Sequence, residues 1–424
     1  MSKKCRRISR RTLVKTGLSA VAMPAVVSLI PANAQSRVIK IGHVSPRTGP
    51  LSGFGQADPF VLEQIRNVVA NGVTHSGRTY PIQIISKDSQ SIPAGASKTA
   101  SELIQRDQVD LIVAAGTPDT TNPVADQAEL HGVPCLTCIT PWQPYFFGRG
   151  GDPRKGFQWT YHFFWGLEDV IEAYIALWNS APTNKVVGGL FDSHEGVAWA
   201  DPETGFPPAL TKSGFRLVDP GRYEPVNLDF TAAISEFKRG GCQIITGNMI
   251  PPDFARFWIQ AAEQEFRPKI VTIGKALLFP TVINSMGSRG NGLTTEVWWT
   301  PTYPFTSGLT GQSARELAEE YMKTTRRPWT QPLGFEHALF EVAIDAVKRA
   351  NSLNKEDVLQ AIIATDYQSI AGHIKWTGQP VKNVCKTPLV TGQWRRTPTS
   401  IDLFVTNNAT APEIPVSSQL ELLS

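Results

Sequence analysis

The chain has 424 residues and a mass of 46.5 kDa. Because single hydrophobic cores stop growing near ~250–300 residues, two domains are expected. Its 41% hydrophobic and 18% charged residues exclude a disordered or fibrous protein, and five cysteines are too few for a disulfide scaffold. The net charge of +4 arises at the amino terminus. Without residues 1–34, 34 positive residues face 37 negative ones, which leaves no electrostatic basis for a nucleic-acid partner.

The first 34 residues have the pattern of an export signal. Basic residues precede an apolar stretch over 17–30, and Ala32-Asn33-Ala34 follows as a small-x-small cleavage site. The stretch is shorter than the ~20 residues that span a membrane, so we expect cleavage after Ala34 and not an anchor. Arg10 and Arg11 match the twin-arginine motif, which predicts export of the folded chain by the twin-arginine machinery, with the general secretory route as the alternative. The mature protein is then expected in the periplasm.

After the signal, short β-branched runs alternate with longer amphipathic stretches, which is typical of strand–helix units around parallel sheets. A first set of strands is expected at Val38–Val44, Tyr80–Ser86, Asp110–Ala115 and Val133–Thr140, with helices at Phe60–Asn71, Ala94–Arg106 and Asn122–His131. A second set is expected at Val186–Phe191, Phe215–Val218, Gln243–Gly247 and Lys269–Gly274, with helices at Phe206–Lys212, Asp229–Arg239 and Pro252–Gln264. Later helices are expected at Ser313–Thr324, Gly334–Ala350 and Lys355–Ala364.

The connections between these sets fix the expected domain boundaries. Trp142–Trp165 is rich in aromatics, Gly and Pro, which suits a crossover between two lobes, and 298–304 is a similar junction. We expect one lobe over 38–155 plus 301–369 and another over 156–300 plus 370–405. Ile374–Trp376 and Pro388–Trp394 are expected to form a small antiparallel hairpin, and residues 406–424 a loosely held tail.

In open parallel sheets, ligands bind at the loops that follow the carboxyl ends of the strands. The expected loops are Ser45–Gly55, Gly116–Pro123 and Thr137–Trp142. With the Asp88–Pro93 turn and the Val109–Val113 strand, they resemble the branched-chain amino acid (Leu/Ile/Val) binding proteins of ABC transporters. The resemblance implies an α/β fold of the type 1 periplasmic binding protein class, with two Rossmann-like doubly wound lobes joined by three crossovers. It also implies a monomer without cofactor that captures a small-molecule ligand and delivers it to the membrane permease of an ABC transporter.

The resemblance assigns ligand contacts in the first lobe. A ligand carboxylate is expected at Gly116 and Thr117, where the amino terminus of the next helix also favours an anion. The alternative is that Thr117 only caps that helix. Further contacts are assigned to Ile139, Thr140 and Trp142, and the first loop contributes Ser52 and Phe54.

The second lobe departs from the family pattern. Amino-acid binders of the family hold the ligand ammonium with an acidic residue, but this chain has Lys275 there, and Met249 lies where an aromatic residue is expected. A lysine repels an ammonium, which makes a zwitterionic amino acid doubtful and makes Lys275 a candidate contact for a carboxylate. The open alternative is that Asp192 or Glu195 supplies the missing acid.

Aromatic residues are expected to line the gap between the lobes. Phe54, Trp142, Tyr145 and Trp299 fall in loops or crossovers there, whereas Phe146, Phe147 and 163–165 are expected to pack the hinge. We therefore expect a ligand with a carboxylate or amide group and an apolar or aromatic body.

An enzyme is not expected. Cys135 and Cys138 have the spacing of a redox or metal pair, but on a buried strand they point to opposite sides. Cys242 and Cys385 are isolated in the sequence, and we expect them to be buried free thiols or to form one disulfide with each other. His337 and Glu341 are expected to form a pair on a helix surface. Nucleophile elbows and phosphate-binding loops are missing from the sequence. A ligand sensor that signals to a partner other than a permease remains an alternative.

Overall fold

The computed structural model describes residues 37–398 and 400–424. The expected export signal, with Arg10, Arg11 and the cleavage site at Ala34, lies outside these residues. Among the residues described, every helix is too short or too polar to cross a membrane.

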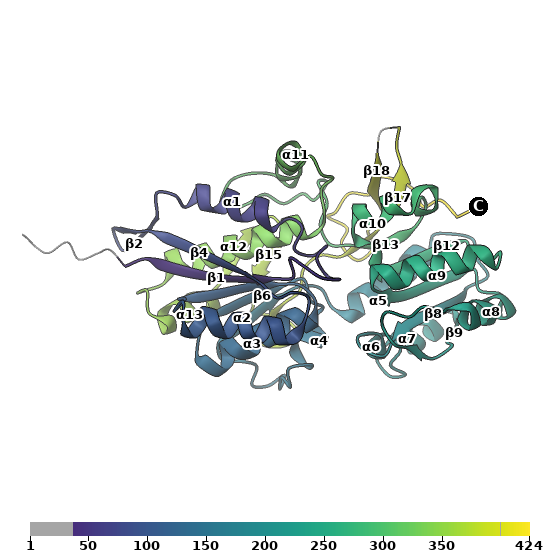
Figure 1. The fold of residues 1–424 in the computed structure, drawn as a ribbon, viewed down its shortest axis with the longest axis horizontal. Helices are drawn as coiled ribbons and strands as arrows, with labels where there is room; N and C mark the ends of the chain where they lie inside the picture. Colours follow the sequence, from purple (N-terminus) through teal and green to yellow (C-terminus); the bar gives the residue numbers. More distant parts are fainter. Residues whose placement is uncertain (1–36, 399) are drawn as a thin grey trace, which may run out of the picture. The chain divides into compact units, whose positions relative to one another are not determined.

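The first lobe is built on a parallel sheet with the strand order β16-β7-β6-β5-β1-β4 (Figure 1). Its strands are β1 (Ile39–Ser45), β4 (Ile82–Asp88), β5 (Leu111–Ala115), β6 (Cys135–Cys138), β7 (Thr160–Phe163) and β16 (Val384–Cys385). The four strands expected from the first set are all present. Of these, β1, β5 and β6 are buried almost throughout because helices cover both faces of the sheet, whereas most residues of the edge strand β4 are only half-buried.

The two faces carry different helices. On one face, α2 (Pro93–Gln105) and α3 (Pro118–His131) pack small residues such as Ala96 and Ala128 against the sheet. On the other, α1 (Asp58–Val68) and α12 (Pro332–Arg349) form the larger core (Figure 1). Beside them lie α11 (Ala314–Thr325) and α13 (Lys355–Ile363). Two small hairpin sheets, β2 (Val73–His75) with β3 (Arg78–Tyr80) and β14 (Asp366–Ser369) with β15 (Gly372–Lys375), complete this lobe.

The second lobe has a mixed sheet in the order β10-β8-β11-β12-β13-β17-β18, with β9 beside β8. Its strands are β8 (Val186–Asp192), β9 (Arg216–Val218), β10 (Arg222–Tyr223), β11 (Ile244–Met249), β12 (Ile270–Lys275), β13 (Thr294–Val297), β17 (Val390–Arg396) and β18 (Ile401–Asn407). Its helices are α5 (Leu167–Asn179), α6 (Gly196–Trp199), α7 (Phe206–Lys212), α8 (Thr231–Gly240), α9 (Pro251–Glu263) and α10 (Pro280–Ser285), with 3-10 turns at Ala276–Leu278 and Gly287–Gly290. Within residues 37–398 the chain passes between the two sheets three times, after β7, after β13 and after β16, which confirms the expected fold class.

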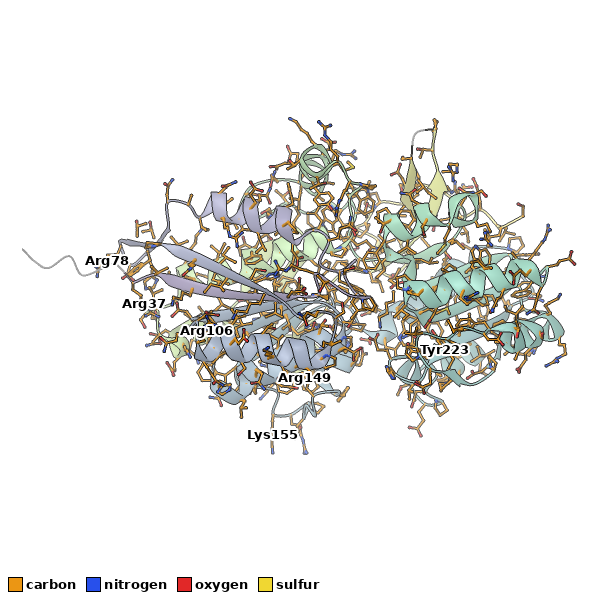
Figure 2. All side chains as sticks on the ribbon, in the orientation of Figure 1. Arg37, Arg78, Arg106, Arg149, Lys155 and Tyr223 are labelled. Carbon is orange, nitrogen blue, oxygen red and sulfur yellow. The ribbon has the colours of Figure 1, made fainter. Side chains whose placement is uncertain are left out.

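The segment between Trp142 and Trp165 differs from its expected role as a crossover. It forms α4 (Trp142–Phe146) and a loop, and then returns to the first sheet as β7. Arg149, labelled in Figure 2, holds the loop in place, because its buried guanidinium binds Asp126 at 2.6 Å and lies 4.0 Å from the centre of the Phe157 ring. The actual passage between the lobes is the short segment that follows Phe163.

The carboxyl-terminal part also differs from expectation. Ile374 lies in β15 and pairs with β14, whereas Val390–Trp394 lies in β17 between β13 and β18, so the expected hairpin does not form. Because β7 and β16 belong to the first sheet, the chain crosses from the first lobe to the second near residues 164 and 386. The expected boundaries were 155 and 370. The tail is bound through backbone bonds, including 2.8 Å from Leu423 N to Lys269 O, and Ile414 is buried. It is therefore not loosely held.

The chemically suggestive pairs of the sequence have structural roles here. Cys135 packs with the α2–α3 face and Cys138 with the opposite core, as expected for residues three apart on a strand. Cys242 and Cys385 are buried free thiols, so the disulfide alternative does not apply. His337 and Glu341 are completely buried, which corrects the expectation of a surface pair.

Gly334 and Trp299 give the first testable consequence of this packing. A Cβ added at Gly334 would lie 2.1 Å from the Trp299 indole, which is itself completely buried. We expect Gly334→Ala to lower the free energy of unfolding by about 1–2 kcal/mol, because a packed core does not accept extra volume without strain. Urea titration measures this loss of stability in Gly334→Ala and in the double variant that also carries Trp299→Phe. The smaller ring should recover part of the loss, and an unchanged Gly334→Ala midpoint would contradict the expectation.

Candidate functional site

A small cavity lies between the two lobes at the carboxyl ends of their strands. It has a free volume of about 40 Å³, room for a few water molecules. One side is lined by residues of the first lobe and of the segment that leaves it after β7: Phe54, Thr117, Pro118, Ile139, Pro141, Phe164 and Trp165. Residues of the second lobe line the other: Glu195, Trp199, Asn248, Lys275, Leu278, Glu296 and Trp298. Parallel strands bring their carboxyl ends to one edge of a sheet, so residues far apart in the chain meet here.

Thr117 carries the polar chemistry of the first-lobe wall. It is the extended N-cap residue of α3, yet its side chain makes no capping hydrogen bond, and its Oγ1 is buried without a partner. Its carbonyl oxygen instead accepts the backbone N–H groups of Thr120 and Thr121. Helix α3 starts at Pro118, four residues earlier than expected, because proline suits the first turn and lacks an N–H to satisfy. The hydroxyl is therefore free, and the capping role considered for it is not seen.

The second-lobe wall contains a charged pair. Lys275 Nζ lies 2.7 Å from Glu195 Oε1, and their side chains are only 12% and 18% exposed. Burial disfavours the charged form of Lys275, but Glu195, with smaller contributions from Asp192 and Asp119, raises the pKa of Lys275. Burial raises the pKa of Glu195, although Lys275 opposes this shift. The positive charge of Lys275 is thus balanced by Glu195 within the same lobe, so Lys275 is not an isolated positive charge.

Glu296 and Asn248 are further polar residues on the same wall. Glu296 accepts hydrogen bonds from the Tyr174 hydroxyl at 2.5 Å, the Thr295 hydroxyl at 2.8 Å and the Lys275 N–H at 3.2 Å. Burial nevertheless raises the pKa of Glu296. The amide of Asn248 is buried, and neither Oδ1 nor Nδ2 has a partner. Asn248 therefore offers one unused acceptor and one unused donor.

Aromatic side chains fill the rest of the cavity wall. Trp165 and Trp298 are buried, and neither indole Nε1 has a hydrogen-bond partner. Phe54 of the first lobe contacts Phe279 of the second edge to face, with 5.0 Å between ring centres. The wall thus combines flat apolar surface with unpaired N–H and O–H donors.

The backbone is strained at two lining positions. Ile139 has φ 70° and Lys275 has φ 67°, a region that non-glycine residues rarely adopt, least of all β-branched ones. Such strain is concentrated at functional sites, where the surrounding structure holds it.

The structure brings together some of the predicted contacts and not others. Phe54, Thr117, Ile139, Glu195 and Lys275 line the cavity, while the remaining predicted contacts lie outside its wall: Ser52, Gly116, Thr140, Trp142, Met249 and Trp299. Thr140 donates to Gly116 O at 2.7 Å, which fixes the two loops to each other. Ser52 is half-buried and its N–H bonds to Gly49 O, while Met249 is buried at the end of β11.

Most aromatic residues predicted for the cavity wall lie elsewhere, and two that were predicted for the hinge line the wall in their place. Trp142 donates from Nε1 to Glu168 at 3.0 Å, Tyr145 stacks on His162, and Trp299 is buried beside Gly334. Phe164 and Trp165, expected to pack the hinge, lie on the cavity wall instead. The missed residues Asn248, Glu296 and Trp298 each sit at or just after the end of a second-lobe strand. That position was the available signal, although β13 was not predicted as a strand.

Residues 38–397 match a family model described as "Periplasmic binding protein". The chain belongs to this family. The resemblance to branched-chain amino acid binding proteins is confirmed by the match and by the fold. This periplasmic binding protein matches no curated protein in a sequence search.

Solved structures with this fold include several solute-binding proteins. A leucine-binding protein from Thermotoga maritima is 19% identical, with a TM-score of 0.69 over 88% of this chain and 99% of that one. A solute-binding protein of an ABC transporter from Rhodopseudomonas palustris, in complex with 3,4-dihydroxybenzoic acid, is 17% identical, with a TM-score of 0.70 over 88% and 99%. A Leu/Ile/Val/Thr/Ala-binding protein from Brucella ovis in its closed conformation is 16% identical, with a TM-score of 0.71 over 91% and 98%. These TM-scores show that the chain shares their fold.

Proposed function

We propose that this protein is the solute-binding component of an ABC importer, a binding protein and not an enzyme. It captures a small ligand between its lobes in the periplasm and delivers it to the membrane permease. Family membership supports the class of function. The observation that carries the proposal is a cavity between the lobes whose buried polar atoms lack partners within the protein. An unpaired buried polar group costs about 1–3 kcal/mol, and a ligand that pairs it removes that cost.

The unpaired atoms favour a ligand with acceptor oxygens. Thr117 Oγ1, Trp165 Nε1 and Trp298 Nε1 are donors, and Asn248 adds an N–H donor and a carbonyl acceptor. A carboxylate or carboxamide matches this set, and the aromatic walls suit a flat or apolar body. A carboxylate bound here gains from hydrogen bonds and from the amino terminus of α3, since Lys275 is already paired with Glu195.

An amino-acid-like ligand is the second candidate, because Glu195 and Glu296 both reach the cavity. Each can attract an ammonium, and Glu195 is the acid considered from the sequence as a replacement for the missing one. The cost is competition: Lys275 holds Glu195, and three hydrogen bonds already occupy Glu296. A carboxylate or amide without an ammonium avoids that competition, so it is the better fit.

Thermal melting of the purified protein against aromatic acids, aliphatic acids, short amides and aliphatic amino acids tests the function. A ligand at 100 times its Kd stabilises by ~2.7 kcal/mol, which a melting curve resolves. Stabilisation by an acid or amide alone supports the favoured ligand, and stabilisation by leucine, isoleucine or valine supports the second candidate. No stabilisation across the panel would contradict both ligand assignments.

Thr117→Val provides the site-specific prediction. Valine keeps the shape of threonine but removes the unpaired hydroxyl, so affinity for the ligand found in the panel should fall about tenfold, equivalent to ~1.4 kcal/mol. Thr121→Val is the matched control, because Thr121 is also buried in α3 with an unpaired hydroxyl but does not line the cavity. Isothermal titration of both variants measures the difference. Equal affinities would place the ligand elsewhere.

A further inference from the structure

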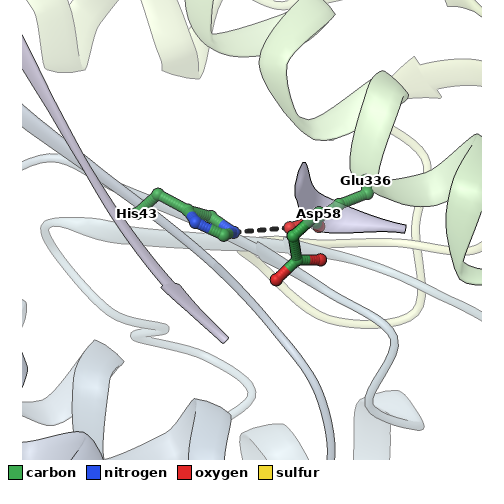
Figure 3. Close-up of side chains that lie close together, drawn as sticks. All are labelled: His43, Asp58 and Glu336. Carbon is green, nitrogen blue, oxygen red and sulfur yellow. Dashed lines mark hydrogen bonds and ion pairs between the residues drawn. The ribbon is translucent and has the colours of Figure 1, made fainter. Parts of the chain in front are cut away.

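A cluster of His43, Asp58 and Glu336 lies inside the first lobe, away from the cavity wall (Figure 3). His43 comes from β1, Asp58 is the first residue of α1, and Glu336 comes from α12. Each can place one donor atom within 4.8 Å of the others, and all three side chains are at most 1% exposed. Three separate elements therefore converge on one point with a nitrogen and two carboxylates.

Outer hydrogen bonds orient two of these side chains, His43 and Asp58. His43 Nδ1 lies 2.9 Å from Ser86 Oγ, and the Ser45 hydroxyl donates to Asp58 Oδ2. His43 Nε2 is thereby turned toward Glu336, with 2.5 Å to Oε1 (Figure 3). Metal-binding histidines and carboxylates are held in the same way, with the second polar atom of each ligand bonded to an outer partner.

Two carboxylate oxygens of the cluster have no hydrogen-bond partner. Asp58 Oδ1 and Glu336 Oε2 are buried and have no hydrogen-bond partner. Among residues 37–398 and 400–424, no Lys or Arg side chain forms a salt bridge with either carboxylate. Burial, and after it the charge of Glu336, raises the pKa of Asp58 well above its usual range. Protons alone could balance the charges, with His43 paired to Glu336 and Asp58 neutral. Asp58 Oδ1 and Glu336 Oε2 would still lack hydrogen-bond partners.

We propose that His43, Asp58 and Glu336 bind a divalent transition-metal ion, with Zn²⁺ as the best match. One imidazole and two carboxylates suit zinc, and two negative charges balance its charge inside an apolar core. The ligand atoms are His43 Nε2, Asp58 Oδ1 and a Glu336 carboxylate oxygen. Binding releases the proton held between His43 Nε2 and Glu336, and any proton on Asp58, to solvent, and it replaces the hydrogen bond between His43 and Glu336 by two metal–ligand bonds.

The ion has a structural role, because it ties β1, α1 and α12 together. Asp58 directly follows the loop that carries Phe54, and Ser45 at the start of that loop is bonded to Asp58. The neighbouring His337 takes no part: it bonds instead to Gln64 and Ser307, at 2.9 Å each. The site is therefore confined to the three residues named.

Metal content after refolding tests the proposal, since a completely buried site is filled as the chain folds. The full-length protein is unfolded with a chelator, refolded with or without Zn²⁺, freed of loose metal by gel filtration and analysed by mass spectrometry of the metal. We expect one zinc per chain and a higher melting temperature in the zinc-refolded sample. Cobalt refolding should give the visible absorption of a Co²⁺ ion in a low-symmetry site.

Variants decide whether the ion sits in this cluster. Asp58→Asn and His43→Gln should each reduce bound zinc at least tenfold, while His131→Gln, at an exposed histidine, should keep it. Refolded wild-type protein without stoichiometric zinc would overturn the proposal, as would zinc retained by a folded Asp58→Asn/Glu336→Gln double variant. Should a single variant fail to fold, metal content and the cobalt spectrum of the wild type still decide. Ligand-induced stabilisation is measured separately, so the two proposals succeed or fail independently.

Discussion

Replacing Lys275 by Met is expected to lower the free energy of unfolding by about 2–3 kcal/mol at pH 7. The change removes the only salt-bridge partner recorded for Glu195 in the described residues and leaves that carboxylate largely buried. Removing one member of a fully buried ion pair costs about 3–5 kcal/mol, and the remaining exposure of 12% and 18% reduces that cost. Denaturant titration of the variant measures it.

The control is the double variant Lys275→Met/Glu195→Gln. Neutralising both partners removes the uncompensated charge, so the double variant should be more stable than Lys275→Met alone. Glu195→Gln by itself should also be destabilising, because it leaves Lys275 largely buried without its salt-bridge partner. Additive losses in the cycle would mean that the two side chains do not interact in solution, and would return Lys275 to the role of a free cationic contact.

Acidification from pH 6 to pH 4 is expected to cost this protein roughly 2–3 kcal/mol of stability through His162 alone. The ring is completely buried on β7, where burial lowers its pKa to about 3. Nε2 donates to Thr140 O at 2.6 Å, and Tyr145 stacks on the ring with 4.1 Å between centres. The unfolded chain binds a proton near pH 6.5 and the folded chain does not, so stability is full above that pH and falls below it.

His162→Gln tests this contribution, because glutamine can still donate to Thr140 O but does not titrate. The variant should be less stable at pH 7 from lost packing, yet its stability should fall less steeply between pH 6 and pH 4. His131→Gln, which changes an exposed histidine, should reproduce the wild-type slope. Parallel curves for the wild type and His162→Gln would show that His162 titrates in the folded state as it does in a peptide.

The strand–helix rhythm was enough to predict the fold. Parallel strands covered on both faces are continuous apolar runs, and helices such as α7 and α13 have marked ends, so their bounds came within a residue or two. Short pairings were not predictable in this way. β16 has two residues and joins β7 across more than two hundred positions, and only tertiary packing selects such a pair over a local hairpin.

The candidate site was predicted where loop chemistry decides and missed where packing decides. Thr117 and Glu195 lie shortly after strands, Lys275 ends one, and all three carry polar groups, so their position alone suggested them. Which tryptophan reaches the cavity depends on where the chain crosses from one lobe to the other. Because Trp142 is drawn to Glu168 and Trp299 fills the space above Gly334, Trp165 and Trp298 take the wall.

The contact between Phe54 and Phe279 has a kinetic consequence. Phe54 lines the cavity and packs on Phe279 of the other lobe, so lobes that move apart to admit a ligand must first break this contact. The rate of capture then depends on how often the lobes separate and not on diffusion alone. The observed Kd equals the intrinsic value divided by the fraction of time spent open. A change at Phe279, which does not line the cavity, therefore tunes how quickly the protein takes up its cargo and how long it keeps it, without touching the groups that recognise it.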